Sequence, residues 1–191
     1  MAIMRRDNDD GRRLDGEGVY LRPPEIRDYA DWSELREESR GFLTPWEPTW
    51  AADELSRGSF RYKLRRYAED VRDDRAYALF VFREEDSALV GGVTLSNVRR
   101  GVAQAASLGY WAGERYAGKG YITAAVRAVT RFAFDELDLH RVEAACQPEN
   151  ASSRRVLTKA GFAEEGQAKA YLKINGQWRD HLLFAYVNPR G

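Results

Sequence analysis

The stretch Arg115-Tyr116-Ala117-Gly118-Lys119-Gly120-Tyr121 decides the fold, because it joins a strand pattern to a helical pattern through a glycine-rich turn. Such a turn directs backbone N–H groups and the N-terminus of the following helix toward one point, which favours anion binding. Gly118 and Gly120 carry no Cβ and let the backbone approach a phosphate closely. Arg115 and Lys119 add positive charge. The stretch therefore predicts a phosphate-binding turn.

Two other interpretations of this turn have to be weighed. Gly113-x-x-x-x-Gly118-Lys119 matches a nucleoside-triphosphate loop except at the last position, where Gly120 replaces the Ser or Thr that holds Mg²⁺. The strand before the turn also belongs to an antiparallel meander, which argues against that loop. A glycine-rich turn without a ligand is the commoner case for a short pattern taken alone. The surrounding sequence must decide.

The apolar pattern on both sides of the turn predicts one α/β domain with a mixed sheet. The connections between the strands before the turn are too short for parallel crossovers. Asn175-Gly176 is a strong signal for a two-residue hairpin turn. The expected elements are strand 19–21, helices 26–40 and 52–73, strands 77–82, 89–95 and 103–111, a helix from the turn to about 138, strand 141–146, helix 151–159, and hairpin strands 170–174 and 178–186, with an aromatic loop over 42–48.

Composition limits the possible functions. The 191 residues, 43% of them hydrophobic, suit one domain, and 30 basic residues balance 30 acidic ones, unlike a uniformly basic nucleic-acid binder. The single Cys146 excludes an internal disulfide, and with only two His it argues against a structural zinc site. We expect no metal. Residues 1–17 lack apolar periodicity and predict a mobile tail before a domain over 18–191. No membrane-spanning or signal-peptide stretch is recognisable, so a cytoplasmic protein is expected.

Two blocks resemble the Gcn5-related N-acetyltransferase (GNAT) superfamily. Arg115, Gly118 and Gly120 match its coenzyme A loop, Arg/Gln-x-x-Gly-x-Gly/Ala. Asn150 to Phe162 is similar to the family segment Asn-x-x-Ser-x-x-x-Leu-x-Lys-x-Gly-Phe. The resemblance implies a single-domain GNAT fold, with a mixed, mostly antiparallel, twisted sheet that is splayed at the fourth strand and flanked by helices.

A closer resemblance is to the RimJ/RimL type of ribosomal-protein-alanine N-acetyltransferases. The aromatic loop Phe42-Leu43-Thr44-Pro45-Trp46-Glu47-Pro48 and the hairpin from Tyr171 to His181 both look like the RimJ branch. This resemblance implies acetyl transfer from acetyl-CoA to the N-terminal amine of a protein.

The resemblance also implies the acetyl-CoA site. The splayed strand would bind the pantetheine arm, the turn would bind the pyrophosphate, and Asn150 would bind near the thiol. Ser153 matches the serine that protonates the leaving thiolate in the RimL type, although a Ser in the first turn of a helix is usually a local cap. The implied coenzyme-binding residues are Leu108, Gly109, Tyr110, Trp111, Arg115, Tyr116, Ala117, Gly118, Lys119, Gly120, Tyr121, Asn150 and Ser153.

The base that deprotonates the amine is less defined. An α-amine has a pKa of about 8, against about 10.4 for lysine, so it needs only a modest base. Glu143 is the candidate, if strand alternation turns it toward the site rather than to solvent. Glu47, beside Trp46 in the aromatic loop, is a second candidate, which could bind the substrate's ammonium or accept its proton.

Two further positions bear on the base. Leu172 stands where the RimL type has a glutamate, so that role does not transfer. Asp180 and His181 could reach the site, but a strand Asp-His pair is usually structural.

Three functions remain open at this point. The leading one is acetylation of a protein N-terminus, such as a ribosomal protein beginning with Ala or Ser. The alternatives are acetylation of a small amine, such as a polyamine or an antibiotic, and coenzyme A binding without turnover. We expect a monomer or homodimer, with no membrane partner and no direct nucleic-acid contact.

Overall fold

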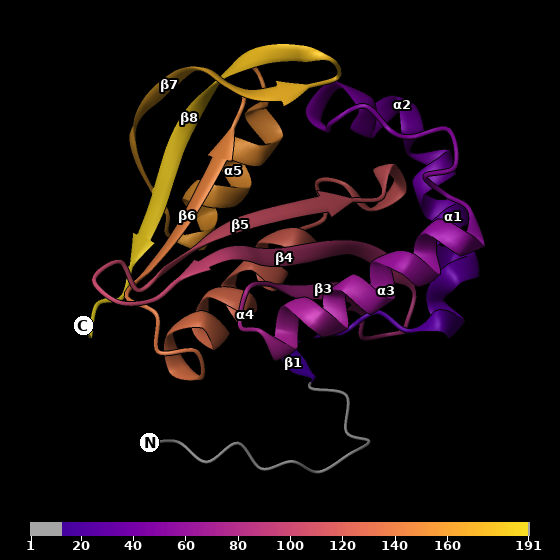
Figure 1. Ribbon diagram of the computed structural model, residues 1–191, viewed down its shortest axis with the longest axis horizontal. Helices are drawn as coiled ribbons and strands as arrows, with labels where there is room; N and C mark the ends of the chain where they lie inside the picture. Colours follow the sequence, from indigo (N-terminus) through magenta and orange to yellow (C-terminus); the bar gives the residue numbers. More distant parts are fainter. Residues whose placement is uncertain (1–12, 191) are drawn as a thin grey trace.

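A mixed eight-stranded sheet forms the centre of the structure, a computed structural model that describes residues 13–190 (Figure 1). The strand order is β1-β2-β3-β4-β5-β6-β8-β7. Every neighbouring pair is antiparallel except β5 and β6, which are parallel. The strands are β1 (Leu14–Gly16), β2 (Val19–Arg22), β3 (Tyr77–Arg83), β4 (Leu89–Arg99), β5 (Ala105–Ala112), β6 (Arg141–Cys146), β7 (Ala163–Ile174) and β8 (Gln177–Val187).

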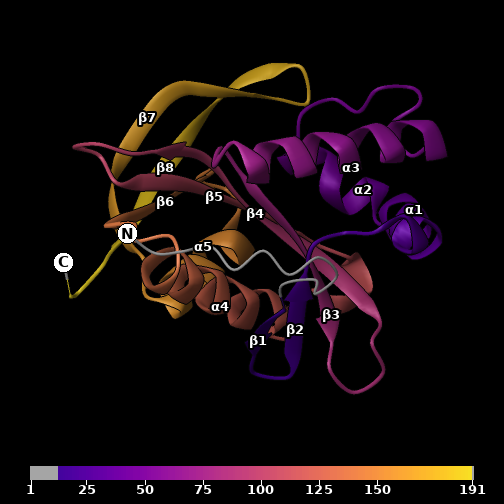
Figure 2. The same cartoon turned by 60° about the horizontal axis from the view of Figure 1, so that its bottom comes forward.

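Helices cover both faces of this sheet (Figure 2). One face carries α1 and α3, and the other carries α4 and α5. The helices are η1 (Ile26–Asp28), α1 (Tyr29–Glu38), α2 (Arg40–Leu43), η2 (Thr44–Trp46), α3 (Arg57–Arg72), η3 (Glu114–Tyr116), α4 (Tyr121–Asp135) and α5 (Ala151–Ala160). No helix within residues 13–190 is long and apolar enough to cross a membrane.

The two faces hold separate apolar cores. The larger core lies under α4 and α5, and nine of the fifteen residues of α4 belong to it. Ala125 and Ala133 of α4 are fully buried, and their small side chains allow the helix to lie close to the sheet. The smaller core is aromatic: the Trp32 and Phe60 rings of α1 and α3 are 4.7 Å apart and pack over β3.

The sheet opens between β5 and β6. These strands pair only from Ala105 to Leu108 on β5 and from Arg141 to Ala144 on β6. Beyond that point β5 continues along β4 as far as Ala112 without pairing with β6. Figure 1 shows the two strands diverging, with β6 directed to the β7–β8 hairpin and β5 to α1. This confirms the predicted splay, at the fourth of the expected strands.

Several boundaries differ from the expected ones. Leu14 is only 8% exposed and lies in β1, so residues 14–17 are not part of a mobile tail, and residues 1–12 lie outside the described part. The second helix begins only at Arg57, where the Ser56 hydroxyl caps it by accepting from the Ser59 N–H. The aromatic loop contains α2 and η2. Strand β7 begins at Ala163, seven residues before the expected start. The sequence did not show these residues because their side chains are mostly exposed and so do not alternate between apolar and polar.

Candidate functional site

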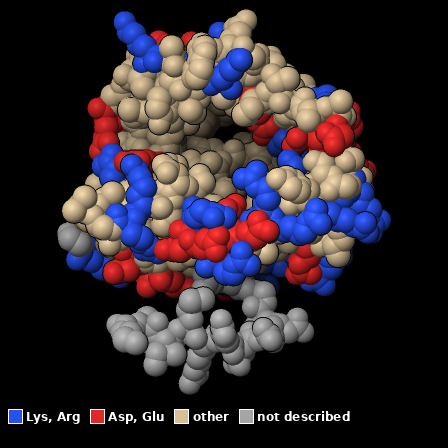
Figure 3. All heavy atoms as spheres, viewed as in Figure 1, with Lys and Arg blue, Asp and Glu red and all other residues tan. Residues whose placement is uncertain are grey.

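A cavity of about 640 Å³ lies where β5 and β6 separate. Figure 3 shows its opening as a hollow in this face of the molecule. Side chains from both faces of the sheet line it, since Tyr110 packs with the core under α4 and α5, whereas Trp111 packs with the aromatic core. The cavity therefore passes through the sheet, with the first turns of α4 and α5 on one side and the 42–47 segment and the β7–β8 hairpin on the other.

The glycine-rich turn borders the cavity at the N-terminus of α4. Gly118 and Gly120 have φ of +74° and +89°, which L side chains rarely adopt. A Cβ on either glycine would meet no heavy atom within 4 Å, so the backbone conformation, not crowding by the protein, calls for glycine. The space beside both Cα atoms is open to a ligand. Tyr116, Ala117, Lys119 and Tyr121 line the same wall.

Arg115 does not line the cavity with its neighbours. Its guanidinium pairs with Glu38 of α1 at 3.0 Å, and about half of each side chain is exposed. The structure thus gives this arginine a role in joining the turn to α1 and does not bring its charge to the cavity. The prediction that Arg115 contacts the coenzyme is not supported by this placement.

The divergent half of β5 forms the floor of the cavity. Leu108, Gly109, Tyr110 and Trp111 all line it, as expected. From Gly109 onward, the edge of β5 that faces β6 has no strand partner among residues 13–190. Its backbone N–H and C=O groups can bind an extended ligand as an added strand would.

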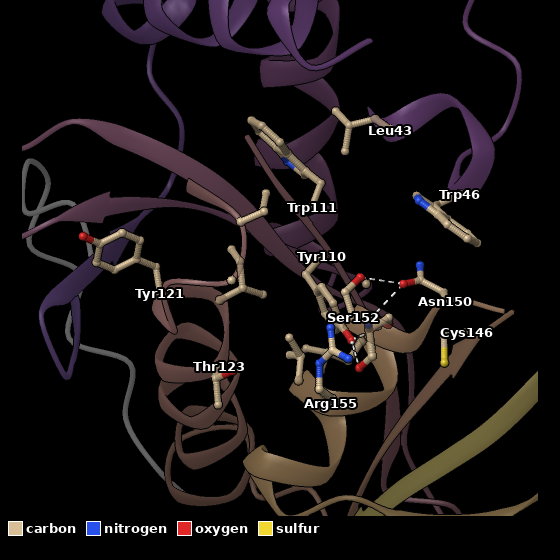
Figure 4. Close-up of a pocket in the computed structure, with 18 of the residues that line it drawn as sticks. Leu43, Trp46, Tyr110, Trp111, Tyr121, Thr123, Cys146, Asn150, Ser152 and Arg155 are labelled. Carbon is tan, nitrogen blue, oxygen red and sulfur yellow. Dashed lines mark hydrogen bonds between the residues drawn. The ribbon is translucent and has the colours of Figure 1, made fainter. Parts of the chain in front are cut away.

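The side chain of Tyr110 extends from β5 toward the first turn of α5 (Figure 4). The Tyr110 hydroxyl lies 2.7 Å from Ser153 Oγ and 3.2 Å from the Ser153 carbonyl oxygen. Burial raises the pKa of Tyr110, so the phenol remains protonated at neutral pH. The sequence pattern assigned only the backbone of Tyr110 to the site, since it could not show that this hydroxyl reaches Ser153.

Asn150 is the N-cap of α5. Its Oδ1 accepts hydrogen bonds from the Ser153 N–H at 3.0 Å and from the Ser152 hydroxyl at 2.8 Å. The carbonyl side of the amide is therefore engaged in holding the first turn of α5. Asn150 lines the cavity, so its Nδ2 group is the part that can still donate to a ligand.

Four cations line the α4–α5 side of the cavity: Lys119, Arg127, Arg155 and Lys159. None of them forms an ion pair with another described residue. Arg127 donates instead to the backbone carbonyl of Lys159. Figure 4 shows Arg155 of α5 on the same side of the cavity as Thr123 of α4. The four-residue spacing of Arg155 and Lys159 on α5 was a usable sequence signal for a cationic helix face, which our prediction missed.

Glu47 and Trp46, for which the sequence suggested contacts with the substrate, line the opposite side of the cavity. Both carboxylate oxygens of Glu47 accept from the Arg36 guanidinium at 2.7 Å, and Trp50 Nε1 donates to one of them at 2.8 Å. Arg36 is only 7% exposed, and its guanidinium lies 4.3 and 4.9 Å from the rings of Trp50 and Trp111. The Glu47 charge is thus compensated by Arg36, and both of its oxygens already accept hydrogen bonds.

Two hydrogen bonds fasten the 42–47 segment over the cavity. Gln147 Nε2 donates to the Pro45 carbonyl at 3.0 Å, from the loop after β6. The Asn175 N–H, in the hairpin turn, donates to the Glu47 carbonyl at 2.9 Å. The segment therefore connects to both β6 and the hairpin, and it encloses this side of the cavity.

Glu143 is not in the site, and the prediction that it acts as the base is corrected here. Its carboxylate pairs with Arg99 and with Arg141, the latter at 2.9 Å. It lies opposite Ser107, where β5 and β6 are still paired, so the opening begins after it. Alternation along β6 turns Glu143 away from the α5 side of the sheet. It lies too early on the strand to reach the cavity, however, which Ala145 and Cys146 of β6 do line.

Cys146 and His181 complete the wall next to the end of β6. Burial raises the pKa of the Cys146 thiol, in keeping with a packing role. His181 is 3% exposed. Within residues 13–190, no group of three or more His, Cys, Asp or Glu side chains is placed to hold a metal ion.

Comparisons with known proteins agree with this geometry. The family model of the acetyltransferase (GNAT) domain matches residues 19–163. The chain is 40% identical to the probable N-acetyltransferase YjcK of Bacillus subtilis over 92% of this chain and 97% of that protein. It is 33% identical to the [ribosomal protein uS5]-alanine N-acetyltransferase of Escherichia coli, over 93% and 91%.

A solved structure shows the same fold. Mycobacterium smegmatis RimJ in complex with CoA-disulfide superposes with a TM-score of 0.86 and 35% identity, over 94% of this chain and 88% of that one. The chain therefore belongs to the GNAT family of acetyltransferases and is an acyltransferase.

Proposed function

We propose that the protein transfers the acetyl group of acetyl-CoA to the N-terminal α-amine of a protein. The observation that carries this proposal is the cavity through the sheet, which joins the glycine-rich turn on one side to the space beside the 42–47 segment and the β7–β8 hairpin on the other. The CoA compound bound to the RimJ relative supports the donor. The name of the uS5-alanine N-acetyltransferase supports the acceptor.

The donor side follows from the placement of the turn and of β5. The pyrophosphate would bind at the N-terminus of α4, between Gly118 and Gly120, where backbone N–H groups are unpaired. The pantetheine arm would extend along the free edge of β5 from Gly109. This path brings the thioester to Ser153, where β5 and β6 separate.

The departure of the coenzyme A thiolate then needs little help from an acid. The amine attacks the thioester carbonyl, and backbone N–H groups of the open strand edge stabilise the developing oxyanion. The departing thiolate resembles a cysteine, with a pKa of about 8.5. Ser153 would donate to it, and the Tyr110 hydroxyl, which remains protonated, would orient Ser153. Direct attack requires no acyl-enzyme, so Cys146 need not react.

The acceptor side favours a protein N-terminus over a polyamine. Phe42, Leu43, Trp46, Leu172 and Ile174 line it and suit a short chain with a small first side chain. A polyamine calls for several free carboxylates. Among the described residues, only Glu17 and Glu47 line the cavity, and Glu47 is paired with Arg36. A ribosomal protein beginning with Ala or Ser, acetylated in the cytoplasm, is the acceptor we propose.

Thiol release from acetyl-CoA tests this function. Peptides beginning with Ala or Ser should release coenzyme A, and the same peptides with a blocked N-terminus should not, even where they contain lysine. Release with spermidine alone would contradict the protein acceptor. Binding of acetyl-CoA without release for any amine would point to a coenzyme-binding module and contradict the enzyme.

A further inference from the structure

We infer that His181 is the base of the reaction: its Nε2 accepts the proton that the acceptor amine loses as the C–N bond forms. The inference rests on the proposed function. As the C–N bond forms and the C–S bond breaks, the amine proton goes to Nε2, and the thiolate takes a proton through the Ser153 hydroxyl, which regains one from water. His181 then returns its proton to water, so the net products are the acetylated amine and free thiol.

His181 lies on the acceptor side of the cavity, which is the side of the 42–47 segment and the β7–β8 hairpin. It lies in β8, one residue beyond the pair that Leu182 makes with Cys146 of β6. Leu182 packs in the core under α5, so alternation turns His181 to the opposite face of the sheet. Ser153 and the four cations lie on the α5 side. The imidazole thus lines the cavity across the sheet from the donor side.

The tautomer of His181 follows from one hydrogen bond. Its Nδ1 lies 3.0 Å from the carbonyl oxygen of Arg179. A carbonyl oxygen only accepts, so Nδ1 carries the hydrogen in this contact. In the neutral ring the lone pair is therefore on Nε2. No other described residue forms a hydrogen bond with Nε2, which leaves it available to an amine in the cavity.

Asp180 next to it has a separate, structural task. Its carboxylate accepts from the Ala170 N–H at 2.8 Å and from Gln167 Nε2 at 3.1 Å. These bonds hold a bulge of β7, in which Ala170 adopts φ of +46°, a strained value for a residue with a Cβ. The bulge brings the Tyr171 ring edge-on to His181, 5.9 Å between centroids. Asp180 thus shapes the wall around the histidine and is not its charge partner.

The other titratable groups around His181 do not compete for this role. Tyr171 of β7 faces it, and Cys146 of β6 and Tyr110 of β5 line the same cavity, but burial keeps the last two protonated. The Glu47 charge is paired with Arg36, and its carboxylate also accepts from Trp50. Of the described residues, His181 is the cavity-lining group with an unoccupied basic atom on the acceptor side.

The test is the pH dependence of kcat/KM with an Ala-starting peptide. A base must be unprotonated to act, so the low-pH limb of the unmodified protein, in which protonation of the amine and of the base both lower the rate, should have a slope of two in log kcat/KM. In His181→Asn, whose amide can still donate to the Arg179 carbonyl, the slope should become one. The rate near pH 7 should fall by roughly a hundredfold or more, the usual effect of losing a general base. The dissociation constant for coenzyme A should not change.

His140→Gln, at the only other histidine of the chain, is the matched control and should keep the slope of two. A slope of one for the unmodified protein, or an unchanged rate in His181→Asn, would overturn the inference. The first measurement needs no variant and stands even if the substitution impairs folding. Failure of acetyl-CoA to bind, or of any peptide to react, would instead contradict the proposed function.

Discussion

Tyr110 and Ser153 share a hydrogen bond of 2.7 Å across the cavity, and this bond joins the divergent half of β5 to the first turn of α5. The two residues lie 43 positions apart in the chain. Asn150 fixes the same serine from its other side by accepting from the Ser153 N–H. The serine is thereby held at the point where the thioester sulfur would lie, which makes Tyr110 a positioning residue for the proposed acid.

Tyr110→Phe should lower kcat by roughly tenfold, and Ser153→Ala by about ten- to a hundredfold, because a thiolate leaving group needs only modest acid help. The double variant should be no slower than Ser153→Ala, since the two hydroxyls act as one unit. Steady-state kinetics of the four proteins test this. Additive losses would show that Tyr110 acts on the reaction independently of Ser153.

Gly120→Ala should weaken acetyl-CoA binding by at least tenfold, because its Cβ would enter the open space beside the turn. The φ of +89° should also cost about 1–2 kcal/mol of stability. Gly101→Ala is the matched control, since Gly101 has φ of +67° and equally open surroundings but does not line the cavity. Thermal unfolding should show a similar loss of stability for both variants. Titration calorimetry should show weaker acetyl-CoA binding for Gly120→Ala alone. Equal affinities would remove Gly120 from the pyrophosphate site.

Local patterns were sufficient to predict most elements of the fold. Strand 141–146 was predicted with its observed bounds, and Asn175-Gly176 does join the final hairpin. Both signals lie within a few residues of the feature they predict. Strand β1 was missed because three residues are too few to show an alternation, and its order depends on pairing with β2.

The site was predictable only where a backbone motif defines it. The turn and the free edge of β5 depend on main-chain conformation, which Gly118 and Gly120 signal directly. The roles of Glu143 and His181 depend on which residues lie opposite them on other strands. Arg99 comes from β4, 44 positions away, and no local pattern showed that it would neutralise Glu143.

Glu143→Gln should leave kcat and KM within about twofold of the unmodified protein, because the carboxylate lies outside the cavity and pairs with two arginines. The substitution removes partners of Arg99 and Arg141, and exposed pairs of this kind contribute at most about 1 kcal/mol to stability. Kinetics and thermal unfolding of this one variant are sufficient. A loss of kcat by a hundredfold with intact folding would restore Glu143 as the base.

The unpaired cations of α5 lead to a prediction about the phosphates of the coenzyme. Most arginines of the described chain pair with a carboxylate, whereas Arg155 and Lys159 face the cavity without one. The double variant Arg155→Gln with Lys159→Gln should bind coenzyme A about tenfold or more weakly, a loss of roughly 1.4 kcal/mol or more. The loss should shrink as salt is raised, because screening weakens an exposed charge contact.

The 3′-dephospho form of coenzyme A shows which phosphate these side chains bind. The turn at Gly118 and Gly120 already provides a site for the pyrophosphate, so we expect Arg155 and Lys159 to contact the ribose 3′-phosphate. The double variant should then bind the dephospho form as well as the unmodified protein does. Arg154→Gln, a matched loss of charge on the same helix at a residue paired with Glu164, should leave both affinities unchanged. Equal weakening for both forms of the coenzyme would place the two cations at the pyrophosphate instead, and would mean that the turn does not bind it unaided.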